Sequence, residues 1–190
     1  MISDKKELRK YLEIECVGRK GIRRLKDFFI PSEKSYLYVL RLTEYYSNKK
    51  GVLHRIIAKY LKFKLDRYQV ATGITIPVNV CAEGLTLYHF GSIVVSDHST
   101  IGKNCCIMNN VNIGANKGEV EAPKIGNDVY IGPGAVLYGN IAIADGCYIG
   151  ANAVVNKSYD EPYSIIAGIP AKVIGKETAP WWKYNRLQRD

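Results

Sequence analysis

Residues 125–137 read IGNDVYIGPGAVL, and the spacing within this stretch decides the fold. An aliphatic residue stands at every sixth position, and glycine follows the first two of them. The same period runs through the second half of the chain, where Glu119 alone interrupts a series formed by Val95, Ile101, Ile107, Ile113, Ile125, Ile131, Leu137, Ile143, Ile149 and Val155. Neither a helix nor an alternating strand keeps this phase for so long. The period predicts a hexapeptide β-helix, in which each hexad forms one side of a coil and its aliphatic residue points toward the axis.

The one interruption of the period predicts a loop over residues 115–123. This segment is polar, contains Gly118 and ends at Pro123. Long loops on a rigid scaffold often carry function. Upstream, the period ends at His89, where a polar residue replaces the expected aliphatic one. Either His89 is a structural residue at the start of the coil, or it is a functional one.

The charge of the chain is unevenly distributed. Residues 1–70 contain 18 Lys or Arg against 8 Asp or Glu, whereas residues 71–190 contain 9 against 10. We therefore divide the chain into a basic helical region (1–70), a β-helix (71–175) and a C-terminal tail (176–190). The cations are either a solvated helix surface or a surface attracted to an anionic partner, such as a phospholipid membrane. No nucleic-acid-binding motif accompanies them.

Three helices are expected in the basic region. Ser3 could cap the first, which would end near Cys16, and Ser32 the second, which would end near residues 48–51. The third spans about Val52 to Gln69. It places on one face a set of apolar residues, namely Leu53, Ile56, Ile57, Tyr60 and Leu61.

Cysteine usage and hydropathy favour a reduced, cytoplasmic protein, which could still contact the inner face of the membrane. The five cysteines lack zinc or redox spacing, and the three in the repeat fit as small apolar fillers. No segment has the pattern of a signal peptide or the apolar length of a membrane span.

Several motifs together resemble the serine acetyltransferase branch of the hexapeptide acyltransferases. They extend from about residue 72 to residue 176 and include GITIP (73–77), LYHFG (87–91), VNIG (111–114), PKIG (123–126), VYIGPGA (129–135), IGANAVV (149–155) and AGIPAK (167–172). The resemblance implies a left-handed parallel β-helix that forms a trimer or a dimer of trimers. It also implies acetyl-CoA as donor and active sites between neighbouring subunits.

His89 aligns with the catalytic base of that family. Transfer of an acetyl group to a hydroxyl requires a base, and histidine can accept a proton near neutral pH. The family's orienting aspartate has no counterpart here, since the matching positions are Ile74 or Thr75, and Tyr88 replaces a second aspartate. The group that holds His89 is then a backbone carbonyl, a neighbour such as Glu83, or a residue of another subunit.

The acceptor side departs from the family. Serine acetyltransferases place an Arg-His pair before Pro-Lys-Ile to bind the carboxylate of serine, and Glu121 and Ala122 occupy those positions here. A glutamate cannot bind a carboxylate. We therefore expect the acceptor to be a sugar hydroxyl in polysaccharide assembly, contacted by Tyr88, Gly91, Asn109 and Glu121. L-Serine is the alternative acceptor.

Small residues mark the expected path of the donor. By the resemblance, acetyl-CoA would follow Gly114, Ala115, Gly132, Pro133, Gly134, Gly150 and Ala151, with Lys172 near the phosphates. Each glycine could also be a simple coil corner. A zinc site of the three-histidine type is disfavoured, because only His89 and His98 lie in the repeat. A non-catalytic trimeric scaffold is the remote alternative.

Overall fold

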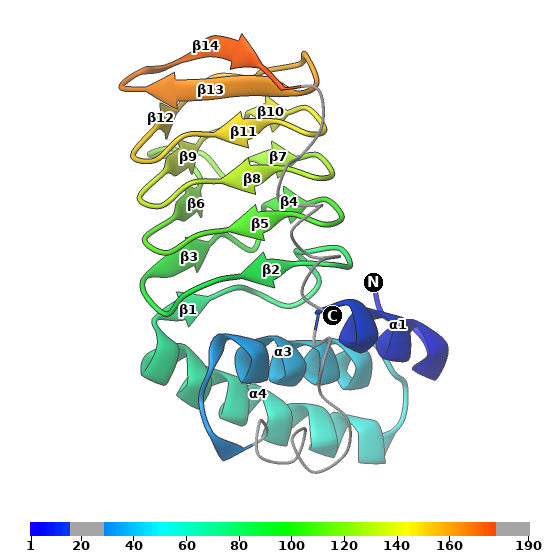
Figure 1. Cartoon of the computed structure of the whole chain (residues 1–190). Helices are drawn as coiled ribbons and strands as arrows, with labels where there is room; N and C mark the ends of the chain where they lie inside the picture. The colour runs from blue at the N-terminus through cyan, green and yellow to red at the C-terminus, as the bar shows by residue number, and fades with distance from the viewer. Residues whose placement is uncertain (16–28, 178–190) are drawn as a thin grey trace.

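The computed structural model describes residues 1–15 and 29–177, in which helices pack beneath a β-helix (Figure 1). The helices are α1 (Lys5–Glu15), α3 (Glu33–Ser47) and α4 (Val52–Thr72). Most of the tail expected at 176–190 lies outside the described residues, as does Cys16. Within them, no helix combines the length and the apolar character needed to cross a membrane.

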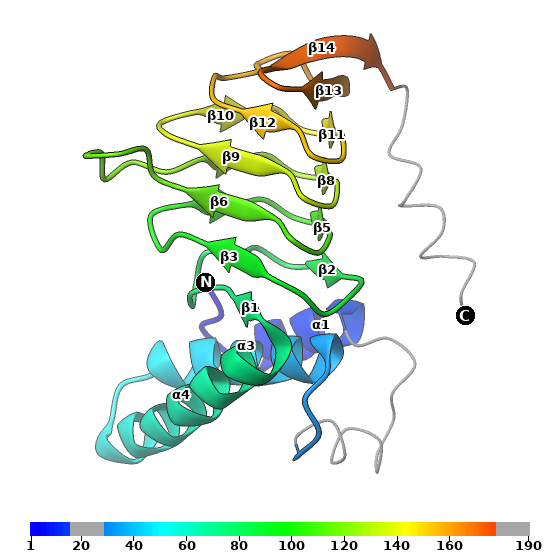
Figure 2. The ribbon, with the colours of Figure 1, turned by 90° about the vertical axis from the view of Figure 1, so that its left-hand side faces the viewer.

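The strands form three faces of a left-handed parallel β-helix (Figures 1 and 2). Face A contains β1 (Ile74–Thr75), β3 (Ile93–Val95), β6 (Asn112–Gly114), β9 (Val136–Tyr138) and β12 (Val154–Val155). Face B contains β4 (Thr100–Ile101), β7 (Lys124–Ile125) and β10 (Ala142–Ile143). Face C contains β2 (Thr86–Leu87), β5 (Cys106–Ile107), β8 (Tyr130–Ile131), β11 (Tyr148–Ile149), β13 (Ser164–Gly168) and β14 (Ala171–Lys176). Every named pair is parallel except β13 with β14, which closes the far end.

The predicted aliphatic series fills the axis of the coil. All ten of its members are buried, with Ile125 the most accessible at 4%. A second buried position in most hexads holds a small or β-branched residue, such as Cys105, Val129 or Ala153. The β-helix predicted from the six-residue period is thereby confirmed.

Each coil turns three corners as the chain passes from face A to B to C. We call residues 88–92, 108–110, 132–135 and 150–153 the C–A corner, and residues 96–99, 115–123, 139–141 and 156–158 the A–B corner. The predicted loop lies at the A–B corner between β6 and β7, and it projects from the coil (Figure 2).

A buried arginine joins the helices to the first coil. Arg41 on α3 is fully buried and donates to the carboxylates of Glu15 and Glu44 at 2.8–2.9 Å. It also donates to the carbonyls of Cys81 and Ala82, at 2.9 Å each. Burial raises the pKa of Glu15, and the positive charge of Arg41 opposes that rise. The Arg41 cluster thus closes the open end of the β-helix.

The helix boundaries agree with the sequence predictions except in detail. Ser32 caps α3 in a capping box with Ser35, as the sequence indicates. Asp4 rather than Ser3 caps α1, because its carboxylate accepts from the Glu7 amide at 2.8 Å while Ser3 donates to the Glu7 side chain. Helix α4 continues to Thr72 and ends at Gly73, which adopts φ 73°.

Helix α4 packs through a different face than its apolar residues suggest. The buried residues are Leu61, Leu65, Tyr68 and Thr72, which lie on one line along the helix. Of the predicted apolar face, Leu61 is buried, whereas Leu53, Ile56 and Tyr60 are more than half exposed. Apolar residues lie on two sides of α4, so the sequence pattern alone does not show which side packs against the rest of the protein.

Candidate active site

His89 lies on the surface of the first coil, at the C–A corner directly after β2. Strand β2 holds Leu87 in the core, and the chain turns outward through Tyr88 and His89 before Gly91. The Gly91 amide donates to the Thr72 carbonyl at the end of α4, at 3.2 Å. The end of the helix and the first turn of the coil therefore hold this segment, and the imidazole is open to solvent.

Several predicted site residues form a column above His89. Leu87 pairs with Ile107, Ile107 with Ile131, and Ile131 with Ile149. Two positions after each of these four residues, the C–A corner presents His89, Asn109, Pro133 and Ala151 in successive coils. Hydrogen bonds fix this stacking, from the Gly134 amide to the Asn109 carbonyl (3.0 Å) and from the Asn152 amide to the Pro133 carbonyl (2.9 Å).

Lys172 stands at the far end of this column. It pairs with Ala167 in the β13–β14 hairpin, and Ala167 lies above Gly150. Neighbouring strands are about 4.8 Å apart, so four coil steps separate His89 from the level of Gly168 by roughly 19 Å. The predicted base and the predicted phosphate contact thus lie at opposite ends of one surface strip.

Other predicted site residues lie on a different corner of the same chain. Gly114 ends β6, Ala115 follows it at the A–B corner, and Glu121 is exposed on the loop. Face A separates this corner from His89. The structure therefore brings Tyr88, Gly91 and Asn109 close to His89, and leaves Gly114, Ala115 and Glu121 apart from it in a single chain.

The orienting group proposed for His89 cannot be Glu83. Glu83 lies before β2, at the opposite end of the strand from His89, and forms ion pairs with Lys10 (2.8 Å) and Lys103 (3.3 Å). The hydrogen bond from Lys10 is the main cause that holds the pKa of Glu83 below its usual value. Within the described residues, the ring of His89 contacts Tyr88 at 6.5 Å between centroids and has no hydrogen bond.

An aromatic surface beside His89 was not predicted from the sequence. Tyr130 and Tyr148 stack at 4.7 Å on the outer side of face C, and Tyr88 and Met108 pack against the same cluster. Burial raises the pKa of Tyr130 to about 12, so its hydroxyl stays protonated at neutral pH. The sequence did contain a signal for this stack, because the two tyrosines are eighteen residues apart and eighteen residues make one full coil. Cys106 is buried in this cluster rather than in the axis.

The glycines of the column have a structural reason of their own. A Cβ at Gly132 would lie 2.8 Å from the Ala151 nitrogen and the Ile149 oxygen, and one at Gly150 would lie 2.9 Å from the Ala167 Cβ. Close stacking of coils therefore requires small residues there. Gly114 differs, since its Cβ would meet only the Asn112 side chain, at 3.4 Å. Packing does not explain the glycine at that position.

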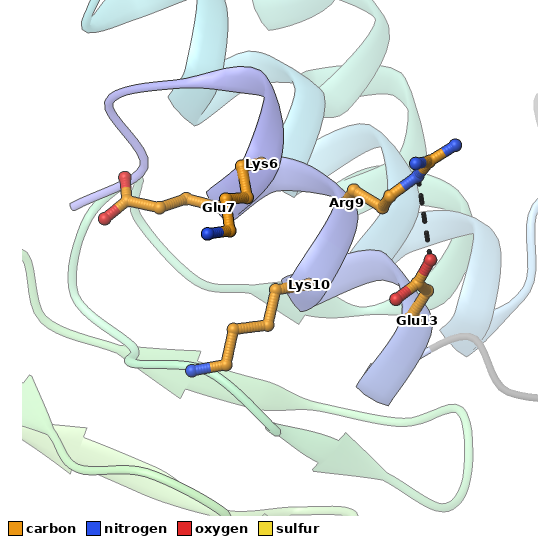
Figure 3. Close-up of a pocket in the computed structure, with 5 residues that line it drawn as sticks. All are labelled: Lys6, Glu7, Arg9, Lys10 and Glu13. Carbon is orange, nitrogen blue, oxygen red and sulfur yellow. Dashed lines mark ion pairs between the residues drawn. The ribbon is translucent and has the colours of Figure 1, made fainter.

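The other two histidines and a surface hollow lie outside the column that contains His89. His98 is exposed at the A–B corner beside Asp97, and His54 is half-buried next to Tyr46. A hollow of about 430 Å³ lies on α1, between side chains that all come from that one helix: Lys6, Glu7, Arg9, Lys10 and Glu13 (Figure 3). It is not near His89. Across residues 1–15 and 29–177, no three potential metal-ligand side chains lie together.

Comparisons with known proteins agree with this geometry. Residues 122–157 match the bacterial transferase hexapeptide (six repeats) family. The serine acetyltransferase of Staphylococcus xylosus is 34% identical over 137 residues, which cover 70% of this chain and 60% of that protein. A solved serine acetyltransferase in complex with cysteine superimposes with a TM-score of 0.65 at 25% identity, covering 89% of this chain and 67% of the other. A solved serine acetyltransferase in complex with CoA superimposes with a TM-score of 0.62 at 25% identity, covering 78% of this chain and 60% of the other.

The repeat region therefore has the β-helix fold, and residues 122–157 within it are similar to the bacterial transferase hexapeptide family. The chain is also similar to the serine acetyltransferases. The chain spans about 60% of the length of the curated relative from Staphylococcus xylosus.

The predicted sugar acceptor is wrong. The similar proteins described above are serine acetyltransferases, and one of the solved structures is a complex with cysteine. The prediction assumed that loss of the Arg-His pair leaves the carboxylate of serine without a compensating charge. The loop and the strand that follows it still present two exposed cations, Lys117 and Lys124.

Proposed function

We propose that this protein transfers an acetyl group from acetyl-CoA to the hydroxyl of L-serine, with His89 as general base. The observation that carries the proposal is an exposed histidine at the foot of the C–A column, in a chain similar to serine acetyltransferases. Cysteine, the ligand in one similar structure, differs from serine only in having a thiol in place of the hydroxyl. A site similar to the one that binds cysteine would also accept serine, which is a small amino acid of nearly the same shape.

His89 moves the proton in this reaction. Its imidazole accepts the proton of the serine hydroxyl while the oxygen attacks the thioester carbonyl. The bond from that carbonyl carbon to sulfur then breaks, and the imidazolium returns the proton to the departing thiolate. The products are O-acetylserine and CoA. An exposed ring on a rigid corner can reach both reactants.

The donor would lie along the C–A column. Its thioester belongs next to His89, and its phosphates belong near Lys172 on β14, five strand spacings or roughly 24 Å away. The backbone at Gly132, Pro133, Gly134, Gly150 and Ala151 lies along that path, and the small side chains there allow a close approach.

The assembly we propose is a trimer with its active sites between subunits. In one chain, His89 and the loop lie on different corners, so neither corner alone presents all the predicted groups. A neighbouring subunit that sets its A–B corner against the C–A corner would bring Gly114, Ala115 and the loop to His89. It would also supply the group that orients the imidazole. The buried, free thiols of Cys81, Cys105, Cys106 and Cys147 support a reducing cytoplasmic setting.

Lys117 and Lys124 are the residues we assign to the serine carboxylate. Both are exposed, one in the loop and one at the start of β7. A cation from this loop would replace the family's Arg-His pair, although a lysine binds a carboxylate as a point charge rather than in a bidentate manner. The loss of this contact should raise KM for serine more than it lowers kcat.

The test measures CoA release from acetyl-CoA with and without L-serine. His89→Gln should lower kcat/KM by about 10²–10⁴-fold, whereas His98→Gln, at the other exposed histidine of the repeat, should leave it unchanged. Lys124→Gln and Lys117→Gln, alone and together, test the carboxylate contact, with serinol as the acceptor that lacks this group. Wild-type protein that does not turn over serine, or an active His89→Gln variant, would contradict the proposal.

A further inference from the structure

Helix α4 exposes a second apolar face that no described residue covers. Six side chains form this outer stripe with exposed fractions from 56% to 88%, namely Val52, Leu53, Ile56, Tyr60, Phe63 and Val70. Helical geometry places them opposite Leu61, Leu65 and Tyr68, which pack inward. Six apolar side chains that are exposed together on one side of a helix indicate a contact surface.

The outer stripe is bordered by positive charge. Helix α4 carries Arg55, Lys59, Lys62, Lys64 and Arg67 against a single acid, Asp66. Arg55, Lys59 and Lys62 lie along one border of the stripe and form no ion pair with other described residues. Lys64 lies on the other border, over the ring of Phe29 at 5.0 Å. Phe29 is itself 66% exposed and extends the apolar surface.

The location of α4 suits a flat partner. The helix lies below α3, at the end of the molecule opposite β14 (Figures 1 and 2). Its inward side contacts α3, so the outer stripe faces away from α3 and from the β-helix. A trimer with parallel coils would present three such helices at the same end.

We propose that the outer stripe and its basic border bind the surface of an anionic lipid bilayer. A helix with one apolar face and flanking Lys and Arg lies in the interface of a bilayer, with the apolar residues among the lipids and the cations at the headgroups. The charge decides against a second copy of this chain as the partner. Pairing two outer stripes would set two helices with five cations and one acid each against one another.

The experiment is co-sedimentation of the full chain with lipid vesicles. One set contains phosphatidylcholine alone, and the other contains equimolar phosphatidylcholine and phosphatidylglycerol. The protein should bind only the anionic vesicles, and less at high salt because salt screens the charges. Each cation near such a surface contributes about a fivefold factor in binding. Replacing Arg55, Lys59 and Lys62 by Gln should therefore weaken binding on the order of 100-fold.

Variants of the apolar stripe separate lipid from protein partners. Ile56→Asp with Phe63→Asp should abolish vesicle binding without loss of helix content, because both side chains point to solvent. Ile174→Asp, at an equally exposed apolar residue on β14, is the matched control. Equal binding to both vesicle types, or no effect of the stripe variant, would overturn the proposal. No binding by the wild type, with a lower mass of the stripe variant in sedimentation velocity, would assign the surface to a second copy instead.

Discussion

The β-helix and the helices beneath it (α1, α3 and α4, which we call the helical base) differ in the polar groups that they bury. The axis of the β-helix holds aliphatic and small residues, and the coils bond to one another through their backbones. The base instead buries an arginine between two glutamates, fixed to the first coil by two carbonyls. Many equivalent contacts stabilise the first region, whereas the second adds to its apolar contacts one charged cluster that is costly to leave incomplete.

The largest effect on stability should follow from Arg41→Met. Removing the guanidinium leaves the carboxylates of Glu15 and Glu44 buried without compensation, which typically costs about 3–5 kcal/mol. Chemical denaturation at fixed protein concentration measures the loss. Arg9→Met is the matched control, since its ion pair with Glu13 is exposed and spans 3.7 Å, and it should cost about 1 kcal/mol or less.

A triple variant sharpens this test. Arg41→Met with Glu15→Met and Glu44→Leu removes all three charges, so much of the lost stability should return. If the triple variant is no more stable than Arg41→Met, the effect comes from hydrogen bonds rather than from uncompensated charge. These are the bonds of Arg41 to two carbonyls and the bonds that backbone amides of the first coil donate to the two glutamates.

The next effect concerns the axis of the coil. Ile131 is fully buried between two neighbouring coils, and Ile131→Ala should lower the free energy of unfolding by about 2–5 kcal/mol. Val94→Ala, at a side chain that is 40% exposed on the outside of face A, should change it by about 0.5 kcal/mol or less. Similar losses at the two positions would show that the axis does not carry the stability of the repeat.

The sequence predicts the core of the β-helix but not the buried cluster of the helical base. The core of the β-helix was predictable because each hexad repeats the same local requirement, an aliphatic residue at a fixed phase. The Arg41 cluster was not, since Arg41 is one of 18 Lys or Arg in residues 1–70 and its partner Glu15 is 26 residues away. Nothing periodic marks such a pair.

The candidate site could be proposed from the sequence residue by residue, but its arrangement in space could not. His89 followed from the resemblance and from the end of the period. The placement of the loop on another corner could have been found by counting sides, because three hexads make one coil. The choice of acceptor failed because it gave most weight to Glu121 and Ala122, two positions of one loop, and to the short helical region before the coil.

A smaller effect distinguishes two glycines of the repeat. Gly132→Ala should cost about 1–3 kcal/mol, because the new methyl would lie 2.8 Å from backbone atoms of the next coil. Gly114→Ala should leave stability unchanged, since its Cβ meets only a side-chain oxygen at 3.4 Å. If the donor passes Gly114, the same variant raises KM for acetyl-CoA. Unchanged stability and unchanged KM would remove Gly114 from the donor path.

The smallest effect tests the link between the two regions. Glu83 joins them, because it accepts from Lys10 of α1 and from Lys103 of the second coil. These lysines hold the pKa of Glu83 below its usual 4.5 in the folded protein, so the stabilisation is complete above that pH and is lost as the pH falls through the lower, folded value. Both lysine side chains are more than half exposed, which limits the contribution to about 1 kcal/mol or less. Glu83→Gln should thus be less stable than the wild type at pH 7, with a difference that vanishes in acid. A difference that persists at low pH would show that Glu83 acts through packing rather than charge, as do the apolar residues of α3 and α4 that share a core with the first coil.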